Sequence, residues 1–160
     1  MSTVSKITAA VQAAVAGISS ANNFLTAAVV TENFPPALAD DLASPVVIGV
    51  FLVGLQIDES EVKSLAGKQT FDSPTHVMVQ IKAIIRTSTD KAEGDKQNLV
   101  ADLQAAIFAD RSLGVGATNG TVTVETITFQ NFGYSQAATG VLVDFDAVVR
   151  VDCLTNPSAP

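Results

Sequence analysis

The alternation of hydrophobic and polar positions is most regular between residues 140 and 153. Apolar residues take every second position and mostly charged residues lie between them: Val141, Val143, Phe145, Ala147, Val149, Val151 and Cys153 against Asp144, Asp146, Arg150 and Asp152. Successive side chains of a strand point to opposite faces, so this pattern predicts a long strand with one buried and one polar face. We expect it to be the spine of a sheet whose apolar face carries the helices.

Three further segments have the composition of strands. Residues 46–57 are apolar almost without interruption, which predicts a strand buried on both faces. Residues 75–87 alternate, with one apolar face: Val77, Val79, Ile81, Ala83 and Ile85. Residues 121–132 alternate too, but their phase changes near 125–126, which indicates a bulge. A turn at 133–140 would join this segment to the closing strand in a long hairpin.

Helical spacing of apolar residues predicts two helices. The first covers residues 3–19 and has one apolar stripe: Val4, Ile7, Val11, Val15 and Ile18. The second covers residues 90–110 and stacks three apolar residues: Leu99, Leu103 and Ile107. Asp90 followed by Glu93 predicts a capping box at its start, and Gly114 is placed to terminate it.

These elements predict an α+β fold with a mainly antiparallel sheet of four to five strands, two helices on one face and a long C-terminal hairpin. Residues 24–31 fit either a short strand or a helical turn. The prolines of residues 34–45 exclude a central strand there. We expect a single domain over residues 1–153 and a tail at 154–160.

Composition changes the picture of the surface. Of the 160 residues, 48% are hydrophobic and only 16% are charged, which is a low charge content for a small domain. An apolar surface covered by other subunits would explain this, as would an alanine- and valine-rich monomer. Two helices can cover only one face of a small sheet, so the second face of residues 46–57 favours a neighbouring subunit.

Charge and targeting signals exclude some classes of function. A net charge of −7 argues against a domain that grips nucleic acid through its phosphates, although DNA could pass nearby without being held. No run is long and apolar enough to span a bilayer. The helical period of the N-terminal stretch, interrupted by Gln12, favours a mature helix over a signal peptide. The single cysteine, Cys153, lies in phase with the apolar face of its strand and is expected to be buried.

The sequence offers little chemistry. His76 is the only histidine, and no cysteine or carboxylate lies at ligand spacing around it. The aspartates of the closing strand could hold a hard cation, but a solvated or interface-facing surface partly paired by Arg150 is the stronger interpretation. The glycine-rich residues 114–120 follow a helix and precede a strand, which is the wrong order for a phosphate loop. We therefore expect no enzyme, and no catalytic, cofactor-binding or metal-binding residue.

Residues 58–74 form a long polar connection between two predicted strands. Long connections are often functional, so we identify four charged residues as candidate partner contacts: Glu59, Glu61, Lys63 and Lys68. A mobile solvent loop is the alternative. At this level two classes of function stay open, a structural assembly subunit and a ligand-binding or catalytic α+β domain.

The element order, together with a helix ending in Asp110-Arg111-Ser112-Leu113-Gly114, resembles the tail terminator (tail completion) proteins of tailed bacteriophages. The resemblance covers roughly residues 1–153. It implies a hexameric ring that caps the finished tail tube, stops tube polymerisation and presents a surface to the head connector.

The resemblance also implies the partners and the location. The tail tube protein, the sheath where the tail has one, and the head connector or stopper protein would contact the ring, with genomic DNA passing through it without sequence-specific binding. The protein would assemble in the host cytoplasm and reside in the neck of the virion. A head-completion or connector-stopper subunit is the first alternative, and an unrelated soluble α+β ligand-binding domain is the second.

Overall fold

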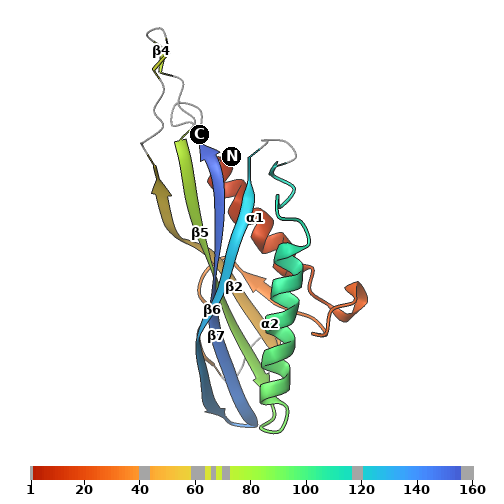
Figure 1. Ribbon diagram of the computed structural model, residues 1–160. Coiled ribbons are helices and arrows are strands. Elements are labelled where there is room, and N and C mark those ends of the chain that lie inside the picture. The colour runs from red at the N-terminus through yellow and green to blue at the C-terminus, as the bar shows by residue number, and fades with distance from the viewer. Residues whose placement is uncertain are drawn as a thin grey trace.

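The computed structural model describes residues 2–39, 44–58, 64–65, 68–69, 73–116 and 121–155. Two helices lie on one side of a five-stranded sheet (Figure 1). The helices are α1 (Thr3–Ala16) and α2 (Ala92–Phe108). A short 3-10 turn, η1 (Ser20–Asn22), follows α1 along the chain. The strands are β1 (Val30–Glu32), β2 (Val46–Ile57), β3 (Ser64–Leu65), β4 (Lys68–Gln69), β5 (Ser73–Thr87), β6 (Thr123–Ala137) and β7 (Gly140–Thr155).

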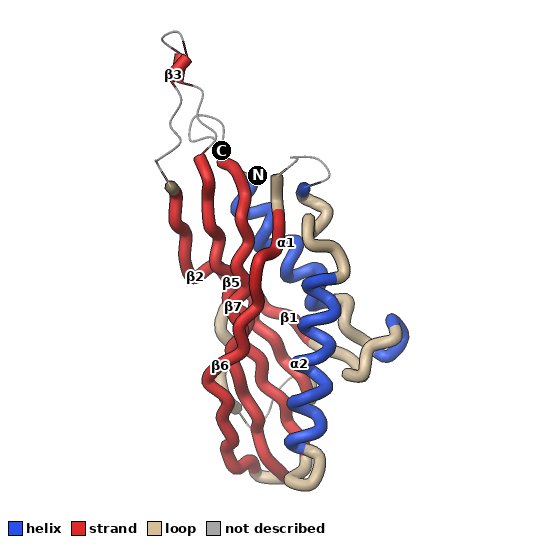
Figure 2. The backbone as a smooth tube through the Cα atoms, viewed as in Figure 1, coloured by secondary structure: helices blue, strands red, loops and turns tan. Residues whose placement is uncertain are grey.

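The main sheet has the strand order β1-β2-β5-β7-β6 (Figure 2). The β1–β2 pair is parallel, and every other neighbouring pair is antiparallel. The predicted fold class is therefore confirmed. The strands β3 and β4 form a separate small pair between β2 and β5. Of the tail predicted at 154–160, residues 154 and 155 belong to β7, and residues 156–160 lie outside the described part of the chain.

The core lies between the helices and the apolar face of β5 and β7. Every predicted inward residue of these strands is buried, and Val79, Ile81, Phe145 and Val149 are completely buried. The stripe of α1 packs on them through Ile7, Val11 and Val15, and that of α2 through Leu99, Leu103 and Ile107. The apolar side chains that alternate along the strands and those that recur at helical spacing thus pack into one core, as predicted.

The helix ends differ from the prediction. The first helix ends at Ala16, with Gly17 as its C-cap, and Ser2 caps its start by accepting a hydrogen bond from the Ser5 backbone N–H. The predicted capping box on the second helix is wrong, because its N-cap is Lys91 and makes no side-chain cap hydrogen bond. Glu93 is instead drawn to Tyr134 on β6, a partner distant in sequence.

The second helix also ends earlier than predicted, at Phe108 rather than near residue 110. A separate turn follows, in which the Asp110 carboxylate accepts hydrogen bonds from the backbone N–H groups of Ser112 and Gly114. Gly114 has φ = 68°, so it shapes this turn in the left-handed region that glycine favours. The prediction that Gly114 terminates the helix is therefore wrong, because the C-cap is Ala109 and Gly114 belongs to the turn that follows.

The C-terminal hairpin is longer than predicted. The bulge near Glu125 is confirmed by a register shift between Val124 and Thr126. The predicted turn at 133–140 is wrong, because β6 continues to Ala137, which pairs with Gly140. A second register shift between Gln130 and Gly133 breaks the alternation there, and this break made the last part of the strand look like a turn in the sequence.

The connector before β2 crosses the sheet at Gly49. A Cβ atom built on Gly49 would lie 2.3 Å from the Phe34 carbonyl oxygen and 2.6 Å from Pro36 Cδ. Only glycine leaves room for such a close approach of two backbones. Of residues 24–31, the strand alternative holds only at the end, where Val30 begins the short β1.

A candidate assembly surface at the edges of the sheet

The second half of β2 is exposed, against the prediction that 46–57 is buried on both faces throughout. The first five residues, from Val46 to Val50, are buried. Beyond them, four aliphatic side chains are exposed by almost half: Leu52 44%, Val53 47%, Leu55 49% and Ile57 46%. Completing their burial would contribute roughly 3–6 kcal/mol in total. The prediction failed because neither helix reaches this end of β2.

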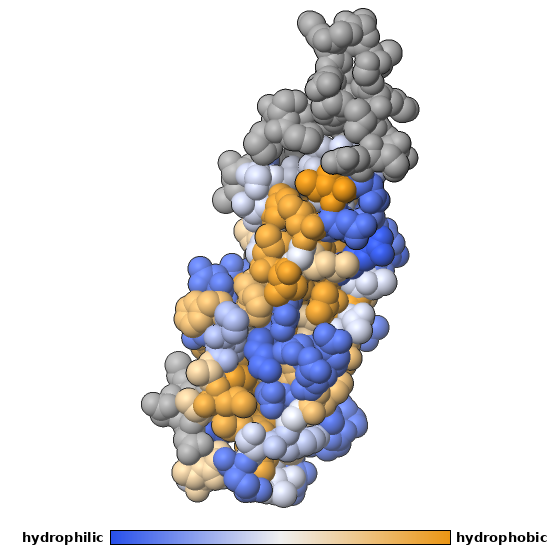
Figure 3. Space-filling view, turned by 90° about the vertical axis from the view of Figure 1, so that its left-hand side faces the viewer, coloured by the Kyte–Doolittle hydropathy of each residue, from blue (hydrophilic) through white to orange (hydrophobic). Residues whose placement is uncertain are grey.

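A bulge concentrates these apolar side chains. The pairing of β2 with β5 shifts between Leu52 and Gly54, so Val53 is an extra residue. Leu52 then lies opposite Val79 and Leu55 opposite Val77, on the face that carries the helices. Figure 3, which looks onto the left-hand side of Figure 1, shows apolar residues gathered in this region. The core face of the sheet thus continues outward, past the helices, into solvent.

The backbone of the same segment is also available. Strand β1 pairs only with residues 47–49 of β2, and within the described residues no other strand lies on the outer side of β2. An unpaired edge strand invites pairing with another chain, and monomeric proteins usually protect such an edge with charged residues or proline. Residues 50–57 contain neither. We call this segment the β2 edge.

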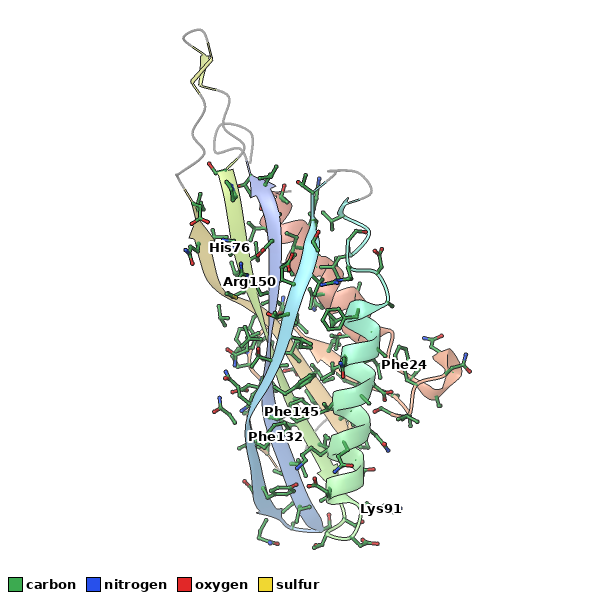
Figure 4. The ribbon with its side chains drawn as sticks, in the orientation of Figure 1. Phe24, His76, Lys91, Phe132, Phe145 and Arg150 are labelled. Atoms are coloured by element: carbon green, nitrogen blue, oxygen red, sulfur yellow. The ribbon has the colours of Figure 1, made fainter. Side chains whose placement is uncertain are left out.

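The opposite end of the sheet has a second edge of the same kind. Strand β6 is mostly exposed and carries no charged residue from 126 to 137, a segment that we call the β6 edge. It exposes two aromatic side chains, Phe132 by 46% and Tyr134 by 52%. The Phe132 ring centroid lies 5.4 Å from that of the buried Phe145 (Figure 4). Exposed, anchored aromatic side chains are typical of binding surfaces.

Helix α2 fixes the aromatic pair on the β6 edge. Lys96 Nζ lies 5.2 Å from the centroids of both the Phe132 and the Tyr134 rings, a cation–π arrangement. Glu93 accepts hydrogen bonds from Gln97 and Tyr134 and forms an ion pair with Lys96. Lys96, then Tyr134 and Gln97, lower the pKa of Glu93 to about 2. The rings are therefore held in place before any partner arrives.

Four charged or polar residues cluster beside the β2 edge, on the opposite face of the sheet. His76 Nδ1 lies 2.7 Å from Asp152 Oδ1, and His76 Nε2 lies 3.1 Å from Asp58 Oδ2. Arg150 donates to both carboxylate oxygens of Asp152. Figure 4 shows His76 and Arg150 close together near this end of the sheet. Strand pairing produces the cluster, because His76 lies directly opposite Asp152.

Contacts within the cluster shift the pKa values of His76 and Asp152. The hydrogen bond to Asp152, and then that to Asp58, raise the pKa of His76 above its ordinary value. Burial of Asp152 opposes ionisation, but the hydrogen bonds from Arg150 and His76 prevail and lower its pKa. Sequence reasoning assigned no partner to His76, because both carboxylates are distant along the chain.

Asp144 and Asp146 have a different partner. Lys82 Nζ lies 3.1 Å from Asp144 Oδ2 and 3.3 Å from Asp146 Oδ1. Asn131 also donates to Asp146 Oδ2. Burial would lower the pKa of Lys82, but the two aspartates outweigh it and raise that pKa. The polar face of β7 is thus paired with β5 through Lys82 and His76, while Arg150 pairs with Asp152 on β7 itself, as predicted.

The described residues contain no group of three metal-ligating side chains that could hold an ion. A hollow of about 210 Å³ lies beside His76, but Asp58 and Asp152 engage both of its ring nitrogens. Neither described helix is long and apolar enough to cross a membrane.

A larger hollow of about 330 Å³ lies between α2, the start of β2 and the loop at residues 25–28. Buried Asp102 anchors this loop by accepting hydrogen bonds from the backbone N–H groups of Leu25 and Thr26, at 3.0 and 2.7 Å. Sequence reasoning missed Asp102, because a single aspartate in a helix gives no sign of what it binds.

Of the predicted contact residues, Glu59, Glu61 and Lys63 lie outside the described residues. Lys68 begins β4, where it pairs with Leu65. All four lie in the stretch of sequence between Asp58 and Ser73, which connects β2 to β5.

The chain is similar in fold to several solved structures, at low sequence identity. One is the sheath/tube terminator, in its extended state, of an extracellular contractile injection system (PVC), with a TM-score of 0.47 and 11% identity. That match covers 98% of this chain but only 59% of the other protein. Another is a chain of the virion of a native gene transfer agent, with a TM-score of 0.39, 15% identity and coverage of 93% and 95%. No family model matches the sequence, and no curated protein matches it significantly.

Proposed function

We propose that the protein is a tail terminator, a structural subunit that forms a hexameric ring on the end of a phage tail tube. The ring stops tube polymerisation and joins the tail to the head connector. The observation that carries the proposal is the β2 edge, an uncharged and half-exposed apolar strand that a lone molecule leaves uncovered. The sequence resemblance supplies the kind of assembly.

The acidic character of the chain fits a place in the path of the genome. A net charge of −7 repels DNA phosphates, so DNA slides through the ring without adhering to it. The ion pairs of Lys82 with Asp144 and Asp146, and of Arg150 with Asp152, hold the charged side chains of the polar face in place. The ring would reside in the neck of the virion, after assembly in the host cytoplasm.

We further propose that the segment between Asp58 and Ser73 contacts the tube or the sheath, through Glu59, Glu61, Lys63 and Lys68. The fold does not depend on this segment for strand pairing, because Ile57 pairs with Thr75 and the Asp58 N–H donates to the Pro74 carbonyl at 2.8 Å. A deletion of residues 60–72 therefore leaves the sheet intact and abolishes capping. Tails of normal length and full infectivity after this deletion would refute the contact.

The function itself is tested with tail tubes from the source particle. Mass photometry and electron microscopy of the protein with tubes should show rings of six copies on tube ends, and tube growth should stop. Only monomers, with and without tubes, would overturn the proposal. Rings found on the portal side of the neck, away from the last tube ring, would assign the stopper function instead.

A further inference from the structure

We propose that copies of this chain join head to tail, by pairing the β2 edge of one copy with the β6 edge of the next. This inference specifies the contact within the proposed ring and rests on that function. The contact joins two different surfaces of the same molecule. Such a heterologous contact can repeat around a ring, whereas a contact between identical surfaces closes as a dimer.

Charge points to these two surfaces. With a net charge of −7, copies of the chain repel one another over most of their surface. Residues 50–57 and 126–137 carry no charge at all, and they lie on opposite sides of one sheet, on β6 and on the part of β2 beyond its pairing with β1. Contact between them brings no charged side chains of the two edges together, so repulsion is least there.

Strand direction agrees with such a contact. Between β2 and β6 lie three antiparallel pairings, namely β2–β5, β5–β7 and β7–β6. Strand β6 therefore runs opposite to β2. When a second copy is placed beside the first with its helices on the same side, its β6 strand runs antiparallel to the β2 edge. Through β5 and β7, Val50 is level with Phe129 and Leu55 with Val124, so the second copy must also be shifted along the strands for its β6 edge to meet the β2 edge. The sheet then continues across the boundary with its alternation unbroken.

The side chains agree as well. On the helix-facing side, the β2 edge presents Leu52, Leu55 and Ile57. On the same side, the β6 edge presents the half-buried Ile127 and Phe129 and the exposed Tyr134. A continued sheet would place apolar side chains beside apolar ones, so the pairing buries both groups at once.

One end of β6 is closed to a partner. The Val124 N–H donates to the Arg111 carbonyl at 2.7 Å, and the Arg111 guanidinium donates to the Val124 carbonyl. Both backbone groups of Val124 are thus satisfied within the chain. A partner strand can pair only beyond this point, which is where the uncharged run from 126 to 137 begins.

The test uses two variants with lysines on one edge each, since lysine on an edge strand blocks pairing. Variant X carries Leu52→Lys and Leu55→Lys, and variant Y carries Thr128→Lys and Ser135→Lys, all at exposed positions. The control carries the same added charge on the exposed surface of α2, through Ala101→Lys and Gln104→Lys. Thermal unfolding confirms that all three fold.

Head-to-tail pairing predicts that X alone and Y alone form no ring and cap no tube, whereas the control behaves like the wild type. An equimolar mixture of X and Y should give a 1:1 dimer that grows no further. The contact uses the intact β6 edge of X and the intact β2 edge of Y, so only the two altered edges stay free. Mass photometry with X and Y of different mass shows this dimer directly.

Three results would overturn the pairing. Dimers of Y alone would mean that β2 edges pair with each other. Rings formed by X would mean that the β2 edge is not needed, and rings formed by Y would mean that the β6 edge is not needed. These failures differ from failure of the proposed function, in which the wild type itself forms no ring and caps no tube.

Discussion

Leu52 and Leu55 lie on the same face of β2, although residues three apart in a regular strand lie on opposite faces. The bulge at Val53 causes this, and it turns two core-like side chains toward a region that no helix covers. The strand that reads as the most buried in the sequence is therefore the one with the largest apolar exposure.

Leu55→Ser should lower the free energy of unfolding of the free chain by only about 1 kcal/mol, because half of the side chain is already exposed. Ile81→Ala on the neighbouring strand, where the side chain is fully buried, should cost about 2–5 kcal/mol. Urea denaturation of dilute protein measures both. Similar losses for the two variants would mean that Leu55 is buried in the free chain.

Gly49→Ala and Gly94→Ala should change stability in opposite directions. The new methyl group at position 49 would collide with the Phe34 carbonyl, at a cost of about 1–3 kcal/mol. At position 94 a Cβ meets nothing within 4 Å, and alanine favours a helix over glycine by up to about 1 kcal/mol. The same denaturation experiment compares them, and a stabilising Gly49→Ala would disprove the close crossing of the connector.

Stability should depend on pH through His76. Its pKa is raised in the folded state, so its contribution is fully present below the ordinary value of 6.5 and is lost as pH rises through the raised value. The lowered pKa of Asp152 acts at the other end, because that contribution is lost as pH falls below about 4.

His76→Gln should therefore flatten the decline of the unfolding free energy between neutral and mildly alkaline pH. Asp58→Asn should reduce the same decline only in part, since Asp152 still raises the pKa of His76. NMR titration of the imidazole gives the folded pKa directly. An unshifted His76 pKa would show that the ring is not held between the two carboxylates in solution.

Asp102→Ala should leave the backbone N–H groups of Leu25 and Thr26 without their acceptor, at a cost of about 1–3 kcal/mol. Hydrogen exchange at the Thr26 amide should quicken more than exchange at Leu99, which lies in the middle of α2. Equal acceleration at both sites would instead indicate a general loss of the helix.

Local periodicity predicted what depends on near neighbours in the chain. The alternation around Phe145 and the stripe at Ile7 each reveal one face of one element, and both faces are buried as expected. The prediction that Leu55 is buried was wrong, because the burial of this side chain depends on how far a helix extends over the sheet. Glu93 failed as a cap because Tyr134, distant in sequence, competes for its carboxylate. The partners of His76 likewise come from strand pairing, which no local pattern contains.

The opposite directions of β2 and β6 also bear on how many copies could join. Edge pairing alone sets no limit on the number of copies, because each addition leaves the same two free edges. Sheets twist by about 20–25° per strand, so the angle between successive copies decides between a closed ring and an open filament. If copies pair as proposed, a small change in curvature, as from a residue added to or removed from the bulge at Val53, would convert a closed ring into an open filament.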